Sequence, residues 1–300
     1  MTTRPLFRSG YAAVAGLPNV GKSTLVNAAI GERIAIVTAK PQTTRRRLLG
    51  LLTRDDAQVI FTDTPGLCVD AKALHRFLNL EIDRAFADAD VVIAVFDPVA
   101  SEAEQESRVL DKIRLGAKPT LLVVNKTDMV KDKGSLLPRI ADLSAAARFD
   151  EVFCVSAKTG DGVAGVVEAA IARLPEGPAY YPEDDLTTAD MRFLAAEMIR
   201  EQVFLQTGKE IPYSTAVVVN TYREPDGDRP IYIEAEIVVE REGQKGIMIG
   251  AKGTKLRAIG TAARKSLEAF VGHPIYLELF VKVRENWSRD ERMLHKLGYV

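Results

Sequence analysis

The feature that most constrains this chain is the segment GLPNVGKS, which runs from Gly16 to Ser23. It fits the pattern G-x-x-x-x-G-K-[S/T], in which the backbone N–H groups of a glycine-rich loop surround phosphate groups. An apolar run at 11–15 precedes the segment, and the residues at 24–30 suit a helix that ends at Gly31. Because strand, glycine loop and helix follow in this order, we predict a phosphate-binding loop rather than an ordinary glycine-rich turn.

The residue types in this loop suit a nucleoside triphosphate and Mg²⁺. A helix that starts at the end of the loop directs its partly positive N-terminus toward the phosphates. We expect the Lys22 ammonium to reach the β- and γ-phosphates and the Ser23 hydroxyl to bind Mg²⁺. The predicted phosphate-binding residues are Gly16, Leu17, Pro18, Asn19, Val20, Gly21, Lys22, Ser23 and Thr24, together with Gly66 of a later motif.

Two later segments are predicted to sense the γ-phosphate. The polar stretch at 32–45 is interpreted as a mobile switch segment in which a threonine binds Mg²⁺, and Thr43 and Thr44 both qualify. The motif DTPG follows, from Asp63 to Gly66, at the end of a predicted strand. Asp63 would hold Mg²⁺ through water, and Gly66 would bring its N–H close to the γ-phosphate because it lacks a side chain.

A third motif, N-K-x-D, points to guanine as the base. It follows a predicted buried strand at 120–124. The two carboxylate oxygens of Asp128 would accept hydrogen bonds from the guanine ring N–H and amine, whereas adenine would leave a buried carboxylate unpaired. This disfavours an ATP-using enzyme. The Lys126 stem would lie along the base, and N–H groups of an S-A-K segment would meet the guanine carbonyl. The predicted guanine-binding residues are Asn125, Lys126, Asp128, Ser156, Ala157 and Lys158.

Strands and helices alternate through the first part of the chain. Buried apolar runs at 91–96 and 120–124 are each followed by helical patterns. This alternation favours an α/β fold with a mostly parallel, doubly wound sheet and helices on both faces. Two further strands, at 48–53 and 58–61, are joined by a short polar turn. The first of this pair is therefore expected to run antiparallel at an edge of the sheet.

Length and turn residues divide the chain into two domains. A chain of 300 residues is longer than most single domains. The stretch LPEGPAYYPEDDLTT contains three prolines and an acidic run, which is typical of a linker. We therefore predict a P-loop GTPase domain at 1–175, a linker at 176–188, a second domain at 189–285 and a C-terminal tail at 286–300.

The second domain has the predicted element order α-β-β-α-α-β, with a G-x-x-G loop between its two middle helices. This α+β pattern is typical of a type II KH domain, whose loop clamps about four single-stranded nucleotides. The net charge of the chain is −1, but the stretch at 241–265 holds seven basic residues against one acid. A merely solvated helix face and contact with anionic lipid stay open as alternatives. The predicted RNA contacts are Lys245, Ile249, Gly250, Ala251, Lys252, Gly253, Lys255 and Arg257.

The motifs GLPNVGKS, DTPG, NKTD and SAK, in this order, resemble those of the translation-factor-related GTPases. The segment KPQTTRRR and an apolar Leu67, where many small GTPases carry a water-orienting glutamine, narrow the resemblance to the TrmE–Era–EngA group. The resemblance selects Thr44 as the switch threonine and makes Asn19 the candidate ligand of a K⁺ ion. Leucine cannot polarise water, so either hydrolysis is slow or another group positions the nucleophile.

Signatures of the second domain extend the resemblance over nearly the whole chain. The segments RExxxxxTGKEIPYS at 200–214, EREGQKGIMIGAKG at 240–253 and LELFVKVRENW at 277–287 are similar to those of the Era family, bacterial GTPases with a C-terminal KH domain. The resemblance implies a GTP-hydrolysing switch that binds GTP or GDP with Mg²⁺ and contacts the 3′ end of the small-subunit ribosomal RNA. It also implies a role in assembly of the small ribosomal subunit and peripheral association with the cell membrane.

Cysteine usage and hydropathy favour a cytoplasmic protein. Cys68 and Cys154 form neither a disulfide framework nor a metal-ligand spacing. No stretch reaches the roughly 18 uncharged apolar residues that a membrane span needs. The alternative function is a GTPase whose KH-like domain contacts protein or membrane rather than RNA. The sequence assigns no role to His75, His273 or Trp287.

Overall fold

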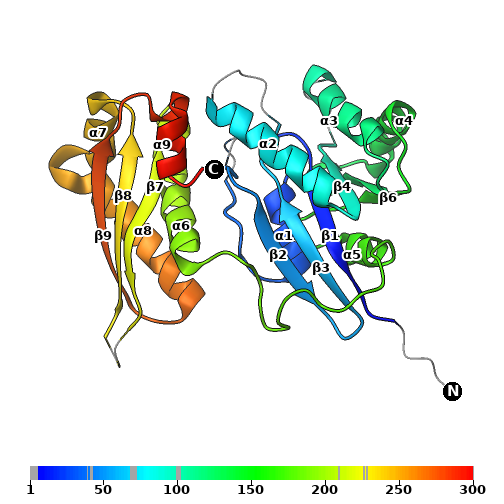
Figure 1. Cartoon of the computed structure of the whole chain (residues 1–300). Helices are drawn as coiled ribbons and strands as arrows, with labels where there is room; N and C mark the ends of the chain where they lie inside the picture. Colours follow the sequence, from blue (N-terminus) through cyan, green and yellow to red (C-terminus); the bar gives the residue numbers. More distant parts are fainter. Residues whose placement is uncertain are drawn as a thin grey trace. The chain divides into compact units, whose positions relative to one another are not determined.

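The chain forms two compact units (Figure 1). The first comprises residues 1–70 and 78–188, and the second comprises 71–77 and 189–300. The computed structural model describes residues 6–38, 40, 43–67, 73–98, 103–208, 210–225, 227 and 229–299. Parts of both predicted switch segments lie outside the described residues, namely 39, 41–42 and 68–72 with Cys68 among them, as do 99–102 and the turn residues 226 and 228.

A six-stranded sheet forms the centre of the first unit, with the strand order β2-β3-β1-β4-β5-β6. Neighbouring strands run parallel except β2 and β3, which pair antiparallel from Leu48↔Asp63 to Thr53↔Gln58. The predicted mostly parallel sheet with an antiparallel edge strand is therefore confirmed. The strands are β1 (Arg8–Ala15), β2 (Leu48–Thr53), β3 (Ala57–Asp63), β4 (Val91–Phe96), β5 (Thr120–Val124) and β6 (Glu151–Cys154).

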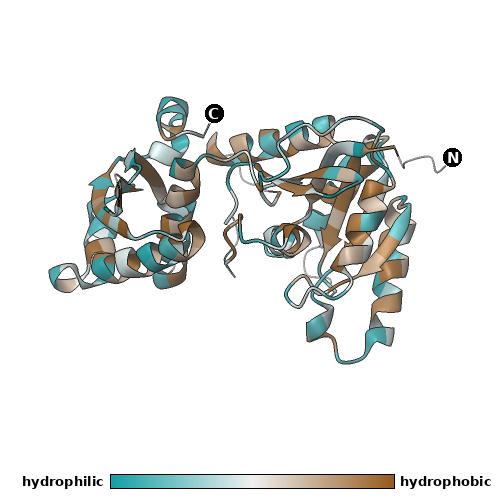
Figure 2. Ribbon diagram, turned by 90° about the horizontal axis from the view of Figure 1, so that it is seen from below, coloured by the Kyte–Doolittle hydropathy of each residue, from teal (hydrophilic) through white to brown (hydrophobic). Residues whose placement is uncertain are grey.

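Helices cover both faces of this sheet. Every residue of β4 and β5 is buried, as expected for parallel strands between two helical layers, and Figure 2 shows these central strands as hydrophobic. On one face Ala85 of α2, and Ala89 just after its end, pack against Ala13 and Val92. On the other, α1 and α5 contact each other and β3. The helices are α1 (Lys22–Ile30), α2 (Ala73–Asp88), α3 (Ala103–Leu115), η1 (Thr127–Met129), η2 (Lys133–Ser135), α4 (Leu136–Ala146) and α5 (Val163–Ile171), of which α2 has its residues 73–77 in the second unit.

The second unit contains a three-stranded sheet with the order β7-β8-β9. The central strand β8 pairs antiparallel with β7 and parallel with β9. The predicted α-β-β-α-α-β order is confirmed by α6 (Met191–Gln206), η3 (Pro212–Ser214), β7 (Ala216–Arg223), β8 (Ile231–Val239), α7 (Glu242–Ile249), η4 (Ala251–Gly253), α8 (Thr254–Val271), β9 (Ile275–Val283), η5 (Trp287–Arg289) and α9 (Glu291–Lys296). Among the described residues of both units, no helix combines the length and hydropathy needed to cross a bilayer.

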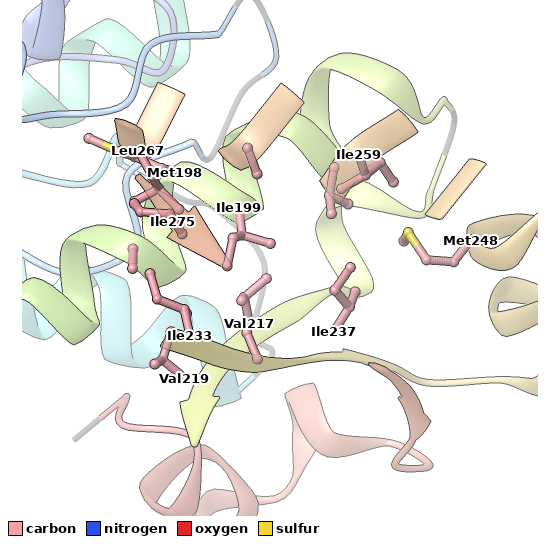
Figure 3. Close-up of a cluster of buried hydrophobic side chains, with 14 of the residues drawn as sticks. Met198, Ile199, Val217, Val219, Ile233, Ile237, Met248, Ile259, Leu267 and Ile275 are labelled. Atoms are coloured by element: carbon pink, nitrogen blue, oxygen red, sulfur yellow. The ribbon is translucent and has the colours of Figure 1, made fainter. Parts of the chain in front are cut away.

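One face of the second sheet carries a hydrophobic core (Figure 3). Alternate residues of β8 are buried from Ile231 to Ile237, as the period of two in a strand requires. Three helices close this core and so fix the sheet beneath α8, the helix that follows the G-x-x-G loop. The core includes Met198 and Ile199 of α6, Met248 of α7, Ile259 and Leu267 of α8, and Val217, Val219, Ile233, Ile237 and Ile275 of the strands.

The β-rich run at 213–222 predicts a strand, but β7 begins only at Ala216. Pro212 instead opens the short helix η3, because its fixed φ suits the first position of a helix, and β7 follows this turn. The Trp287 indole N–H donates to the carbonyl oxygen of Ser214 at 3.0 Å, and the indole stacks on the Tyr299 ring at 5.8 Å. Trp287 therefore has a structural role, and the C-terminal residues pack within the second unit.

Much of the predicted linker packs along the first unit. The side-chain oxygen of Gln58, on β3, accepts hydrogen bonds from the backbone N–H groups of Tyr180 and Tyr181, at 2.7 and 3.0 Å. Farther along, the Leu51 N–H donates to the carbonyl oxygen of Leu186 at 2.9 Å. The bond to Leu186, together with a bridge between Gly50 and Thr187, covers the otherwise open edge of β2 with the segment that leads to the second unit.

Candidate nucleotide site and nucleic-acid groove

The predicted phosphate-binding loop connects β1 to α1. Gly16 and Gly21 have φ angles of 153° and 97°, in a region that favours glycine. A Cβ atom at Gly16 would lie 2.3 Å from the Val95 carbonyl oxygen, and one at Gly21 would lie 2.2 Å from Nδ2 of Asn125. Only glycine therefore lets the loop approach the ends of β4 and β5 this closely. Asn19, in the middle of the loop, is exposed and left-handed, with φ 64°.

Lys22 begins α1 and directs its ammonium back toward the loop. Its Nζ atom donates to the carbonyl oxygens of Gly16 at 3.1 Å and Leu17 at 2.8 Å, and the residue is only 6% exposed. The carbonyl groups stabilise a cation that would be costly to bury unpaired. A held positive charge and a helix N-terminus therefore lie where the phosphates are predicted to bind.

Three side-chain oxygens converge beside the start of α1. The Ser23 hydroxyl donates to Oδ2 of Asp63 at 2.6 Å, and the Thr44 hydroxyl donates to the same oxygen at 3.2 Å. The two hydroxyls lie 3.0 Å apart, and Asp63 is fully buried at the end of β3. Thr43 instead bonds the Thr38 hydroxyl at 2.7 Å. Of the two candidate threonines, Thr44 therefore faces Ser23 and Asp63.

This set of oxygens fits Mg²⁺. Hydroxyl and carboxylate oxygens are the hard ligands that this ion prefers, and it usually keeps several waters beside one or two protein ligands. Ser23 and Thr44 present the hydroxyls, and the carboxylate of Asp63 lies close enough to bind either the ion or its water.

Gly66 brings the DTPG motif against the phosphate-binding loop. A Cβ atom at this position would lie 2.6 Å from the Pro18 ring, so a larger residue would push the two segments apart. Ile36 and Val37, from the switch segment, line the cavity that these loops surround, and the sequence analysis did not single them out. The signal that could have identified them is that they end an apolar run, residues 34–37, within the segment. Leu67 is half-buried and offers no group that polarises water.

Asn125 joins three loops at the centre of the site. Its Nδ2 group donates to the Val20 carbonyl oxygen at 2.8 Å, and its Oδ1 atom accepts from the Ala157 N–H at 2.9 Å. The residue is 2% exposed. The asparagine of the N-K-x-D motif therefore holds the phosphate-binding loop and the S-A-K segment at the end of β5.

Asp128 and Ser156 are linked by a hydrogen bond. The Ser156 hydroxyl donates to Oδ1 of Asp128 at 2.8 Å, which orients the carboxylate predicted to bind guanine. Two residues before Asp128 in the chain, Lys126 has a left-handed φ of 62° and precedes the helix η1, which carries Asp128. The turn after β5 thus directs both predicted base-contacting side chains into one cavity.

This nucleotide cavity has a volume of about 650 Å³. Thirteen of the predicted residues line it: Pro18, Asn19, Gly21, Lys22, Ser23, Thr24, Thr44, Gly66, Asn125, Lys126, Asp128, Ala157 and Lys158. The other predicted residues, Gly16, Leu17, Val20, Asp63 and Ser156, are not in the lining, but each hydrogen-bonds a residue that is. The structure therefore brings the separate motifs together in one place.

The G-x-x-G loop of the second unit has an unusual backbone. Gly250, Lys252 and Gly253 all have positive φ angles, of 73°, 50° and 78°. A Cβ atom at Gly250 would lie 2.8 Å from that of Lys255, whereas nothing lies within 4 Å of one at Gly253. The backbone is therefore open to a ligand at Gly253, immediately before α8 begins.

The loop lies at one end of a groove between α8 and β9. A cavity of about 330 Å³ is lined by Gly253, Leu256, Arg257, Gly260, Thr261, Arg264, Leu277 and Leu279. Of the predicted contacts, Gly253 and Arg257 line it, whereas Lys245, Ile249, Gly250, Ala251, Lys252 and Lys255 do not. Lys255 instead donates to the carbonyl oxygen of Gln206 at 2.9 Å. The sequence analysis missed six lining residues. Two patterns could have identified them, the helical spacing along α8 and the alternate leucines on β9. These residues are Leu256, Gly260, Thr261, Arg264, Leu277 and Leu279.

Two family models match separate parts of the chain, one in each unit. A family model described as "50S ribosome-binding GTPase" matches residues 11–126, and one described as "KH domain" matches residues 210–288. The GTPase Era of Geobacter metallireducens is 44% identical over 98% of this chain and 98% of its own length. That of Azotobacter vinelandii is 42% identical over 100% of this chain and 99% of its own.

Two solved structures of Era are similar to the chain over both units. Era of Aquifex aeolicus, bound to GDP and AlF4⁻, has a TM-score of 0.94 and 35% identity and covers 98% of this chain and 100% of its own. Era in complex with MgGDPNP and nucleotides 1506–1542 of 16S ribosomal RNA has the same TM-score and identity, covering 98% and 99%. With relatives this similar along its full length, the chain belongs to the Era family of GTPases, which hydrolyse GTP to GDP and phosphate.

Proposed function

We propose that this GTPase is a switch that binds single-stranded RNA at the 3′ end of the small-subunit ribosomal RNA and assists assembly of that subunit. The observation that carries the proposal is the groove of the second unit, where a glycine loop and two arginines border leucine side chains. Single-stranded nucleic acid needs cations for its phosphates and apolar surface for its bases. The solved complex of Era with 16S ribosomal RNA supports the same partner for this chain.

At the nucleotide cavity, separate residues serve the phosphates and the base. Lys22 and the start of α1 would hold the β- and γ-phosphates, with Ser23 and Thr44 ligating Mg²⁺ and Asp63 acting through water. Bound Mg²⁺ would neutralise charge on the phosphates. Asp128, oriented by Ser156, would accept two hydrogen bonds from guanine.

Asn19 is the proposed ligand of K⁺ in this site. Leu67 cannot orient the attacking water, so hydrolysis is slow unless another group stabilises the transition state. Asn19 is exposed on the loop that faces the phosphates, and its amide oxygen suits a hard monovalent cation. Replacing K⁺ by Na⁺ is expected to slow GTP turnover in the wild type but not in Asn19→Ala. An equal rate in both salts for the wild type would remove this role.

The switch itself is proposed to operate through the two segments that border the γ-phosphate, 32–45 and 66–72. GTP would order them and hydrolysis would release them. Affinity for an oligonucleotide with the 3′ terminal sequence of the small-subunit RNA should therefore differ between the GTP-analogue and GDP forms. A scrambled oligonucleotide of equal length is the control. Equal affinity in both nucleotide states would exclude the switch, and no binding in either would favour a protein or membrane partner for the second unit.

Sedimentation with purified ribosomal subunits tests the proposed assembly partner. The description of the matching family model names the 50S subunit, whereas we propose that this protein binds the small subunit. The protein with GTP analogue is expected to sediment with small subunits that expose their RNA 3′ end and to be released by an excess of the matching oligonucleotide. Sedimentation with the large subunit alone would overturn the proposal.

The proposed location is the cytoplasm, with peripheral contact at the cytoplasmic face of the membrane. The basic residues of the second unit support attraction to anionic lipid. Flotation with vesicles containing anionic lipid tests this contact, and vesicles of neutral lipid provide the control. Equal recovery with both would exclude an electrostatic contact.

A further inference from the structure

We propose that Asp97 is a positioning residue for the nucleotide base, acting through Lys126. This inference rests on the proposed role of Lys126 in the guanine site. The Lys126 ammonium donates to Oδ2 of Asp97 at 2.8 Å. Lys126 lines the nucleotide cavity and Asp97 does not, so the carboxylate would act on the nucleotide through the lysine.

The sheet topology places these two residues together. Strands β4 and β5 pair in parallel up to Phe96↔Val124, and the Asn125 N–H donates to the Phe96 carbonyl oxygen at 3.0 Å. Asp97 is the residue after β4, and Lys126 is the second residue after β5. Because parallel strands end at the same edge of the sheet, the first turn after each strand lies beside the other.

The pair is partly withdrawn from water. The side chain of Lys126 is 31% exposed and that of Asp97 is 24% exposed. A free lysine has many rotamers, and binding a base along its stem would restrict them at a cost in affinity. With the ammonium already bound by Asp97, the stem is held in the lining of the cavity before the nucleotide arrives.

The backbone beneath Asp97 is itself held by two helices. Arg139 of α4 forms an ion pair with Glu106 of α3, and the side chains are only 12% and 6% exposed. The Arg139 guanidinium lies 6.0 Å from the centre of the Phe96 ring and makes a long contact of 3.5 Å from Nε to the Asp97 carbonyl oxygen. The carboxylate therefore projects from a fixed strand end, as a positioning role requires.

A double-mutant cycle tests the proposal in the full chain. Dissociation constants are measured for GDP, by competition with a fluorescent GDP, in wild type, Asp97→Ala, Lys126→Ala and the double variant. We expect Asp97→Ala to weaken GDP binding about 10-fold in wild type and less than about 2-fold when Lys126 is already alanine. The kcat for GTP should change little while KM rises, because the lost interaction stabilises the bound substrate and the transition state equally.

Two controls separate positioning from general damage. Asp111→Ala removes a carboxylate paired with Arg114 on the surface of α3, and it should leave the dissociation constant within about 2-fold of wild type. Inosine diphosphate lacks only the amine that Asp128 is proposed to bind, so Asp97→Ala should weaken GDP and inosine diphosphate by the same factor. If Asp97→Ala does not fold, Asp97→Asn, which keeps the side-chain shape, takes its place in the cycle.

The outcomes distinguish this inference from the proposed guanine site. An equal loss from Asp97→Ala in both backgrounds, or no loss in either, would overturn the positioning role while leaving Lys126 in the site. If Lys126→Ala binds GDP as tightly as wild type, the role of Lys126 fails and that of Asp97 fails with it. A loss that depends on Lys126 and is shared by both nucleotides supports the proposal.

Discussion

The nucleotide cavity and the RNA groove hold their polar groups in different ways. Around the cavity, Asp63, Asn125 and Ser156 are buried and hydrogen-bond groups on other segments. In the second unit, Lys252 and Arg257 are exposed beside a groove with apolar side chains on its walls. The cavity is thus surrounded by polar side chains that hydrogen bonds join to one another, and the groove is a charged surface over a hydrophobic core.

This difference follows from what each site is proposed to bind. A nucleotide is small, so selection depends on a few groups held at fixed positions, and each lost bond leaves a buried partner unsatisfied. A single-stranded RNA spreads its contacts over several phosphates and bases, each contributing little. Substitutions in the cavity should therefore have larger effects than comparable substitutions in the groove.

The largest effect is expected from Asp128→Asn. The asparagine keeps one acceptor oxygen but replaces the other by an NH2 group, which places a donor against a guanine donor, so affinity for GTP should fall about 10³-fold. Xanthosine triphosphate, which carries a carbonyl in place of the amine, should bind the variant better than GTP. Nucleotide competition measures both values. An unaltered preference for GTP would show that Asp128 does not select the base.

A smaller effect is expected from Asn125→Ala, which removes the bonds to Val20 and Ala157. Two buried backbone groups lose their partner, which should cost about 2 kcal/mol of stability and lower the melting temperature of the nucleotide-free protein by several degrees. Nucleotide affinity should fall as well, because the two loops are no longer joined. Asn125→Asp is the control, since it keeps the acceptor for Ala157 but not the donor to Val20. Equal melting of all three proteins would contradict the network.

The smallest effect is expected in the groove, from Gly253→Asp. The substitution forces a side chain into a positive φ and places a carboxylate where the RNA backbone is proposed to pass, so RNA affinity should fall about 10-fold. GTP hydrolysis without RNA should be unchanged. Gly243→Asp, an exposed position near the start of α7, adds the same charge and should bind RNA nearly as wild type.

If Gly253→Asp reduced RNA affinity by a larger factor than Asp128→Asn reduces GTP affinity, the comparison between the two sites would fail. Equal losses for Gly253→Asp and Gly243→Asp would show that only net charge matters. Equal losses of RNA binding and GTP hydrolysis in Gly253→Asp would contradict the assignment of separate functions to the two units.

Residues that are adjacent in the chain could be assigned to the candidate sites from their sequence pattern. The phosphate-binding loop, DTPG and N-K-x-D each follow a strand, and strand ends of a parallel sheet meet at one edge, so their convergence could be expected. The G-x-x-G loop was likewise predictable from the order of elements around it.

Contacts between distant residues could not be predicted in the same way. Spacing alone does not distinguish Thr43 from Thr44; the family resemblance favours Thr44, and the bonds to Ser23 and Asp63 show that Thr44 faces them. Leu277 and Leu279 on β9 line the groove because α8 packs over that strand, a contact no local pattern specifies. Lys255 was expected to face RNA, but its ammonium bonds Gln206 of α6 instead.

The amino-acid sequence alone specified the Era-type motifs, the α/β and α+β classes of the two units, and the strand that precedes each chemical motif. These depend on short-range periodicity and turn chemistry, which neighbouring residues set. The tertiary structure decided the partners of each side chain, including the pairing of Asp97 with Lys126. Such pairs depend on the alignment of strands far apart in the chain, and that alignment is set by packing of the whole core.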